Sequence, residues 1–140
     1  MAGTFKFELV TPAKMLIPER GDNPKVEPVV EAEQVIVPGM DGQFTVLAGH
    51  APMITSLRPG VLDIKLASGR RRVFVRGGIA EVSPERLTIL AQQLIDLDGL
   101  KDGELEAERR AAEAMLGEAK DDAERMLART AIAELQAIGR

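Results

Sequence analysis

Hydrophobic and polar residues alternate along the chain up to about residue 91, and this period of two is typical of half-buried β-strands. In the opening strand Phe5, Phe7 and Leu9 share one face, while Lys6 and Glu8 occupy the other. Alternation and runs of β-branched residues predict further strands at 29–30, 35–37, 44–47, 61–66, 71–76, 79–82 and 87–90. Many short strands separated by turn-forming residues predict an antiparallel β-sandwich or barrel.

Glycine and proline mark the turns of this part of the chain. The segment 67–70 contains Gly69 and separates two alternating runs, which predicts a hairpin. The segment 83–86 contains Pro84 and separates the last two strands in the same way. Asp41 and Gly42 are likewise predicted to form a hairpin turn rather than a phosphate-binding loop, because no Gly-Lys-Ser/Thr motif and no helix follow them.

The hydrophobic period changes to that of a helix after Lys101. The predicted apolar faces are Leu105, Ala112, Met115, Leu116 and Ala119 in a first helix, and Ala123, Leu127, Ala131, Leu135 and Ile138 in a second. The segment 117–122 is expected to join them, with Asp121 or Asp122 as the N-cap of the second helix. Glu106 with Arg110, and Asp121 with Arg125, have the spacing of helical ion pairs.

The fold class predicted is therefore α+β in two parts, an N-terminal β-sandwich followed by an antiparallel two-helix hairpin. We assign residues 1–93 to the sandwich, 94–103 to a linker and 104–140 to the hairpin. The apolar faces of the helices are narrow and rich in alanine, so we expect the hairpin to depend on packing against another element.

Amino-acid composition excludes several classes of function for this protein. The net charge of −4 argues against a sequence-independent nucleic-acid binder, which needs a basic surface. The absence of cysteine excludes a disulfide framework, a thiol nucleophile and thiolate metal sites. No apolar run is long enough for a membrane helix and the N-terminus has no signal-peptide core, so we expect a soluble, cytoplasmic protein.

Catalytic chemistry has little support in the sequence. His50 is the only histidine, and no nucleophile motif accompanies it, so we expect its ring to bond the backbone of a turn. We expect no cofactor and no metal site. The basic run 70–72 is expected to be solvated, with binding of an acidic partner as the alternative. These features indicate a non-catalytic protein that contacts other proteins.

A set of motifs in fixed order identifies a resemblance to a known family. They are Gly39-x-x-Gly42-x-Phe44-x-Val46-Leu47-x-Gly49-His50-Ala51-Pro52, Leu57-x-Pro59-Gly60, Gly77-Gly78-Ile79-x-Glu81-Val82 and 87–91. With these motifs, the chain closely resembles the epsilon subunits of bacterial F-type ATP synthases. The resemblance extends to the change from strands to helices after Ala91.

This resemblance implies a non-catalytic subunit of the central stalk, which couples rotation of the c-subunit ring to ATP synthesis. The sandwich is then expected to bind the gamma subunit and to stand on the c ring. The hairpin is expected either to fold against the sandwich or to extend into the catalytic alpha/beta head, where it blocks ATP hydrolysis. The subunit would lie at the cytoplasmic face of the bacterial inner membrane, as a peripheral protein.

The resemblance also implies roles for individual residues. The c-ring-facing loop is expected to consist of Met40, Asp41, Gly42, Gln43 and Phe44. The residues expected to shape the neighbouring turns are Gly49, His50, Ala51, Pro52, Gly60, Gly77 and Gly78. Contacts with acidic loops of the head, in the extended form, are expected from Arg109, Arg110, Arg125 and Arg129.

Two departures from the family pattern concern the connection at 19–28 and the start of the hairpin. The connection is longer than usual and is expected to protrude. Ile95-Asp96 begins an ATP-binding motif of some relatives, but the Arg-Ala that should follow is absent, so we do not predict ATP binding. The alternatives are a free-standing β-sandwich adaptor and a small-ligand-binding protein or hydrolase that uses His50. Against the latter stand the missing nucleophile motif and the scarcity of aromatic residues.

Overall fold

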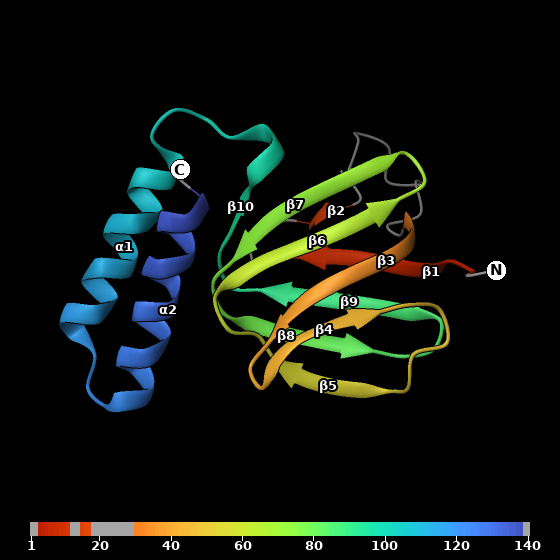
Figure 1. Cartoon of the computed structure of the whole chain (residues 1–140), viewed down its shortest axis with the longest axis horizontal. Helices are drawn as coiled ribbons and strands as arrows, with labels where there is room; N and C mark the ends of the chain where they lie inside the picture. The colour runs from red at the N-terminus through yellow and green to blue at the C-terminus, as the bar shows by residue number, and fades with distance from the viewer. Residues whose placement is uncertain (1–2, 12–14, 18–29, 139–140) are drawn as a thin grey trace.

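The computed structural model describes residues 3–11, 15–17 and 30–138. The predicted protrusion at 19–28 lies outside these residues. In the described part, ten strands wrap into a two-layered β-sandwich, and two helices stand side by side at one end of it (Figure 1). The strands are β1 (Phe5–Val10), β2 (Met15–Ile17), β3 (Val30–Gly39), β4 (Gly42–Val46), β5 (Met53–Ser56), β6 (Gly60–Leu66), β7 (Gly69–Val75), β8 (Gly78–Val82), β9 (Arg86–Ala91) and β10 (Leu94–Asp96).

Hydrogen bonds connect the strands in the order β10-β7-β6-β3-β1-β9-β8-β5, with β2 beside β1 and β4 beside β3. All the pairs are antiparallel except β1 with β9, which run parallel. The predicted antiparallel sandwich is therefore confirmed with one parallel pair. Sequence alternation could not reveal this pair, because it fixes the face of each side chain but not the direction of the neighbouring strand.

The alternation predicted for the first strand matches its burial. Phe5, Phe7 and Leu9 are almost completely buried, whereas Lys6 is exposed. They belong to the main core, a cluster of buried apolar side chains drawn entirely from the sandwich. The described members of the main core also include Val35, Val37, Leu62, Ile64, Val73, Val75, Leu87 and Ile89.

Four details of the sandwich differ from the predicted strands. Val30 and the run 35–37, predicted to be in separate strands, belong to one strand, β3, and Val29 lies outside the described residues. The loop predicted at 67–70 is a shorter turn, because β7 already begins at Gly69. Strand β5 was not predicted, because its residues are exposed or half-buried and show no alternation. The predicted linker begins inside the sheet, since β10 is hydrogen-bonded to β7 and a 3₁₀ helix, η1 (Leu97–Gly99), follows it.

The C-terminal part is the predicted helical hairpin, α1 (Glu104–Glu118) and α2 (Asp122–Ile138). Helix α1 ends at Glu118, inside the segment predicted to join the helices: Gly117 continues its last turn, and Ala119, predicted on the apolar face of this helix, is the C-cap residue. Asp121 caps α2: its Oδ1 accepts a hydrogen bond of 2.8 Å from the backbone N–H of Glu124. The Glu106–Arg110 ion pair is present at 3.8 Å, but Arg125 pairs with Asp122 rather than with Asp121, whose carboxylate serves the cap.

A second apolar cluster, which we call the joint cluster, lies between the sandwich and the hairpin. It consists of Phe74, Ile95, Leu97, Ala112, Ala131 and Leu135, with Val61, Leu105, Ile132 and Ile138 packed at its edges. Of the predicted apolar faces, Ala112, Ala131 and Leu135 are fully buried here, Leu127 is half-buried and Ala123 is exposed. The predicted dependence of the hairpin on another element is thus met by the outer face of β6, β7 and β10.

Candidate interaction surfaces

The turn between β3 and β4 presents the first predicted site. Met40, Asp41 and Gln43 are exposed, and the backbone N–H of Met40 donates a hydrogen bond of 2.8 Å to the Ser56 carbonyl. Phe44 differs from these three, because its half-buried ring packs against the main core. The turn is therefore held rigidly at its base and offers a small exposed tip, which can contact a partner but cannot enclose a ligand.

His50 lies beside this turn and belongs to the backbone framework. Its Nδ1–H donates a hydrogen bond of 2.7 Å to the carbonyl oxygen of Ala51, and its ring centre is 6.1 Å from that of Phe44. Gly49 has φ of +85°, and its N–H donates a bond of 2.8 Å to the Pro84 carbonyl. The ring bonds the backbone of a turn, as expected from the sequence, and within the described residues it forms no hydrogen bond with a hydroxyl or carboxylate.

Close approaches of neighbouring residues explain two of the other glycines singled out by the sequence. At Gly78, a Cβ would stand 2.1 Å from the carbonyl oxygen of Leu90 on the neighbouring strand, and φ is +136°. At Gly60, a Cβ would stand 2.8 Å from Cβ of Pro38. Gly77 precedes Gly78 with φ of +82°. These residues shape the sandwich and contribute no side chain to a site.

An apolar surface that the sequence reasoning missed crosses the outer face of four strands. The strand register places Ser56, Ile79, Leu90 and Val10 in one row from β5 to β1. Ile79 and Leu90 are both 45% exposed, and Ile54 next to the row is 73% exposed. A shallow groove of about 520 Å³ follows the row. We call Ile54, Ile79, Leu90 and Val10 the apolar row.

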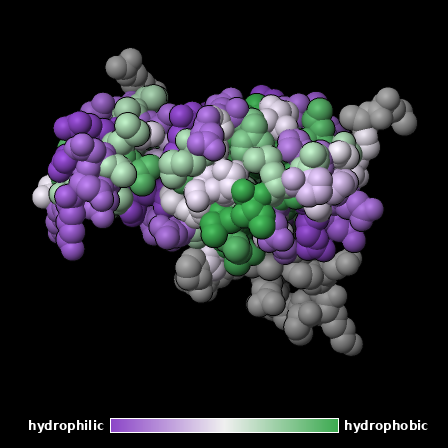
Figure 2. Space-filling view, turned by 90° about the horizontal axis from the view of Figure 1, so that it is seen from below, coloured by the Kyte–Doolittle hydropathy of each residue, from purple (hydrophilic) through white to green (hydrophobic). Residues whose placement is uncertain are grey.

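The space-filling view from below agrees with this arrangement. Apolar residues gather on the sandwich, whereas the hairpin shows mainly hydrophilic residues in the same view (Figure 2). Strand β5 forms the end of the sheet, so its outer edge has no neighbouring strand in the described part of the chain. Exposed apolar side chains at such an edge are typical of a surface that another protein covers.

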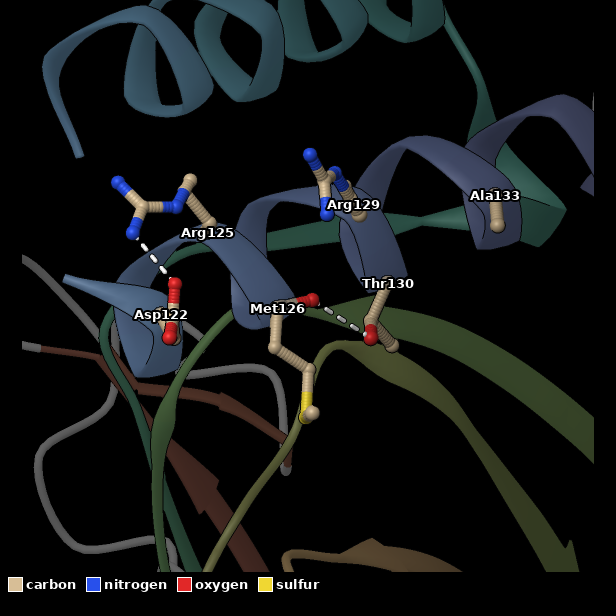
Figure 3. Close-up of a pocket in the computed structure, with 6 residues that line it drawn as sticks. All are labelled: Asp122, Arg125, Met126, Arg129, Thr130 and Ala133. Carbon is tan, nitrogen blue, oxygen red and sulfur yellow. Dashed lines mark hydrogen bonds and ion pairs between the residues drawn. The ribbon is translucent and has the colours of Figure 1, made fainter.

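The four arginines predicted to contact a partner lie on both helices. Arg109 and Arg110 pair with Glu106 at 3.4 and 3.8 Å, within α1. Arg125 pairs with Asp122, and Arg129 forms no ion pair with any of the described residues. Arg125 and Arg129 project from one side of α2 and Met126 from the other (Figure 3). No ion pair or hydrogen bond joins the two sets of arginines in the part of the chain described, so each helix presents its own charges.

An open groove on α2 accompanies the second pair of arginines. It has a volume of about 410 Å³ and is lined by Asp122, Arg125, Met126, Arg129, Thr130 and Ala133, all from one helix (Figure 3). Thr130 turns its hydroxyl back to the Met126 carbonyl at 2.9 Å, and Met126 is 68% exposed. The open groove thus has positive charge on one side and an apolar side chain on the other, which suits a protein surface better than an enclosed ligand.

A charged contact joins the hairpin to the sandwich. Arg76, directly after β7, donates from Nε to Oε1 of Glu108 on α1, and another of its guanidinium nitrogens contacts the sulfur of Met115. Glu108 is only 5% exposed. The sequence contained a signal for it: Glu108 lies three residues after Leu105 and four before Ala112, on the face predicted to be apolar, where a carboxylate requires a partner.

The basic run at the start of β7 is also paired within the chain. Arg70 forms an ion pair with Asp63 at 3.1 Å, and Arg71 with Asp96 at 2.9 Å. The backbone N–H of Arg72 donates a bond of 2.8 Å to Asp98. The expected solvation is therefore only partial: carboxylates of β6 and β10 pair with the guanidinium groups of Arg70 and Arg71, whereas the side chain of Arg72 is exposed.

The comparisons with known proteins add to this geometry. Residues 4–96 match the family model described as the β-sandwich domain of the ATP synthase delta/epsilon chain. The chain is 44% identical over 126 residues to the ATP synthase epsilon chain of Paramagnetospirillum magneticum, covering 87% of this chain and 84% of that protein. It is 40% identical to the ATP synthase epsilon chain of Rhodospirillum rubrum, and the alignment covers 99% of this chain and 96% of that protein. The chain belongs to the ATP synthase epsilon-chain family.

The fold agrees with that of solved members of ATP synthase complexes. A chain in the mitochondrial ATP synthase of Euglena gracilis aligns with 99% of this chain and 81% of its own length, at a TM-score of 0.62 and 19% identity. A chain in the central stalk and c ring of the Tetrahymena thermophila mitochondrial ATP synthase aligns with 99% of this chain and 98% of its own length. The TM-score is 0.64 and the sequence identity is 14%. As an epsilon chain, the protein is a non-catalytic subunit of the synthase. None of the helices in the described residues is long and apolar enough to cross a membrane.

Proposed function

We propose that this epsilon chain works in the central stalk, where it transmits the rotation of the c ring and restrains ATP hydrolysis through its hairpin. One observation carries the proposal: the family match covers a sandwich whose main core is complete without the helices. A domain of this kind can remain bound in the stalk while the hairpin changes position. We place the subunit at the cytoplasmic face of the bacterial inner membrane, held there by its partners.

The experiment that tests the regulatory part measures ATP hydrolysis by the catalytic head with two forms of the chain. The full-length chain should inhibit hydrolysis, and a truncation ending before Asp102 should bind without inhibiting. A truncated chain that inhibits equally would refute the role of the hairpin. Loss of binding by the truncation would instead refute the independence of the sandwich.

The gamma subunit is the partner we propose for the apolar row. Its exposed isoleucines and leucine, the shallow groove and the open edge of β5 together offer an apolar patch at one end of the sheet. Ile54→Asp should weaken co-purification with the gamma subunit, because it places a charge where water must be excluded. Leu100→Asp makes the same kind of change at an exposed position after η1 and should leave co-purification unchanged. Equal recovery of the gamma subunit with both variants would exclude this surface.

The exposed tip of the β3–β4 turn is proposed to face the c ring. Met40, Asp41 and Gln43 are available for contact, whereas Phe44 is held against the main core. We therefore restrict the contact proposed for the turn to its exposed residues. Asp41→Lys should reduce coupling of proton transport to ATP synthesis in membrane vesicles, and Phe44→Leu should instead lower the stability of the sandwich.

The arginines of the hairpin are proposed to contact the acidic surface of the alpha/beta head after the hairpin has moved. Arg129 is the best suited, because no carboxylate in the described part of the chain forms an ion pair with it. Arg129→Glu should reduce inhibition by the full-length chain. Arg110→Glu should have a smaller effect, because Glu106 already neutralises this residue. Undiminished inhibition by both variants would exclude these contacts.

The boundary of the movable part is proposed to lie after η1. The ion pair of Arg71 with Asp96 and the bond from Arg72 to Asp98 attach β10 and η1 to the sandwich. Residues 98–103 are exposed, and Gly103 has φ of +84° directly before α1. We therefore divide the predicted linker at 94–103 into a first part that is attached to the sandwich and a hinge at about 100–103.

A further inference from the structure

The two apolar clusters show how loosely the hairpin is attached. The main core takes no residue from α1 or α2, and the joint cluster takes only Ala112, Ala131 and Leu135 as buried residues from the helices. Two of these three are alanines, which bury little apolar surface. The hydrophobic contribution to attachment is therefore concentrated in Leu135 and in half-buried side chains at the edge of the cluster.

Packing is incomplete at the part of the joint nearest the turn between the helices. A cavity of about 90 Å³ lies there, lined by Leu57, Pro59, Arg76, Gly77, Gln92, Met115 and Leu127. Residues of the sandwich and of both helices border it, so this gap lies in the joint itself. Atoms that line a gap lose dispersion contacts, which weakens the attachment further.

The Arg76–Glu108 ion pair lies beside this cavity. Arg76 reaches from the end of β7, its backbone N–H bonds the Gln93 carbonyl at 2.9 Å, and its side chain is 22% exposed. Among the ion pairs of the described residues, this pair alone connects a helix to the sandwich. The guanidinium also contacts Met115, about two helical turns further along the same face of α1.

The energetics of such a pair differ between an attached and a detached hairpin. With the hairpin attached, the two charges satisfy each other, and the Glu108 carboxylate is almost completely shielded from water. After detachment both charges are hydrated, so the loss of the pair is largely offset by solvation. Removal of one partner changes mainly the attached state, where it leaves either a buried Glu108 carboxylate or a half-buried Arg76 guanidinium without a counter-ion. The pair therefore makes attachment conditional on the presence of both residues.

We propose that Arg76 and Glu108 form a latch that sets the balance between the attached and the detached hairpin. The inference rests on the proposed function to the extent that movement of the hairpin regulates hydrolysis, but the latch itself is a property of the isolated chain. It assigns a specific role to the residue directly after β7 and to a residue of α1, neither of which the family motifs contain. It also predicts that each single substitution releases the hairpin, whereas replacing both charges with apolar side chains does not.

The test measures the distance between two spin labels on the full-length chain. Because the native chain contains no cysteine, cysteines introduced at Ser68 and Glu118 carry the only labels. Both positions are exposed, Ser68 in the β6–β7 turn and Glu118 at the end of α1. Attached and detached hairpins then appear as two populations in the distance distribution.

The variants isolate the latch from other effects. Glu108→Gln should raise the ratio of detached to attached hairpin about tenfold, and Arg76→Met about 100-fold, because the latter leaves a buried carboxylate unpaired. Glu106→Gln is the matched control: it makes the same change on the same helix, where the partners Arg109 and Arg110 belong to α1 itself. The control should keep the native ratio. The double variant Arg76→Met/Glu108→Leu should return the ratio to the native value or below.

Native distance distributions in both single variants would overturn the latch, and so would equal detachment in the Glu106→Gln control. If a single variant unfolds the chain, as judged by circular dichroism, the decision rests on the double variant, which must fold and keep the hairpin attached. ATP hydrolysis distinguishes this proposal from the proposed function. If the variants detach the hairpin but inhibit hydrolysis as the native chain does, the latch stands and the regulatory role of the hairpin is refuted. If truncation of the hairpin abolishes inhibition but the variants do not detach it, the latch alone is refuted.

Discussion

Leu135→Ala tests whether the hairpin and the sandwich are separate cooperative units. Leu135 is fully buried, and it is the only large helical side chain among the fully buried residues described. The substitution removes about three carbon atoms, which corresponds to about 2.4 kcal/mol of transfer free energy at ~0.8 kcal/mol per methylene. A cavity term is added where the site cannot collapse, but half-buried Ile138 and Val61 at the edge of the joint cluster allow relaxation. We therefore expect a cost near the lower end of the usual range, about 2–3 kcal/mol.

This cost falls on the attached hairpin only, since a detached hairpin has already exposed Leu135. At about 1.4 kcal/mol per factor of ten, the ratio of detached to attached hairpin should rise about 30- to 140-fold. Hydrogen exchange should show this as a loss of protection confined to amides of α1 and α2. Amides of β1, β3 and β9 should keep their native protection.

The matched variant is Leu87→Ala in the main core. Leu87 is also fully buried, so the chemical change and the initial burial are the same. It should lower the free energy of unfolding of the sandwich by about 2–5 kcal/mol and reduce the protection of strands and helices together. If Leu135→Ala reduced protection equally in β1 and β9, the two clusters would form one cooperative unit and the reasoning from separate clusters would be refuted.

Three further predictions concern single positions. Gly78→Ala should destabilise the sandwich by at least about 3 kcal/mol in denaturant unfolding, because its Cβ would overlap the Leu90 carbonyl at an unfavourable φ; a smaller loss would mean that β9 can shift. Asp121→Ala should remove the cap bond to Glu124 and cost about 1 kcal/mol, measured as reduced protection of the first turn of α2; unchanged exchange there would refute the cap. His50→Gln should lower stability by no more than about 1 kcal/mol and leave ATP synthesis by the assembled complex close to normal, because the ring bonds only the backbone; loss of synthesis with a stable chain would assign the ring a further role.

The sequence predicted the local elements well where a period was long or a cap was encoded. The alternation of Phe5, Phe7 and Leu9 predicted a strand with one buried face, and the structure buries these side chains. The change of period after Lys101 predicted two helices, and Asp121 was correctly among the two residues expected to cap the second. Such features depend on neighbours within a few residues, so the sequence contains them directly.

The candidate surfaces were harder to predict. The apolar row unites residues of β1, β5, β8 and β9, which only the strand order brings together. Strand β5 itself was missed, since an exposed edge strand imposes no alternation on its residues. The residues of the β3–β4 turn were found by resemblance to the family. The structure shows that their exposure differs, because Met40 is exposed whereas Phe44 packs against the main core.

The amino-acid sequence by itself determined the two-part organisation, the family and the turns. It also excluded a thiol nucleophile and metal sites that use cysteine ligands. Only the tertiary structure decided that β1 and β9 pair in parallel, that the linker begins with a strand, and that Glu108 has Arg76 as its partner. The reason is physical: periodicity and capping are local properties, whereas a buried charge is satisfied by whichever residue the topology brings within reach. Arg76 and Glu108 are far apart along the chain, and no local pattern connects them.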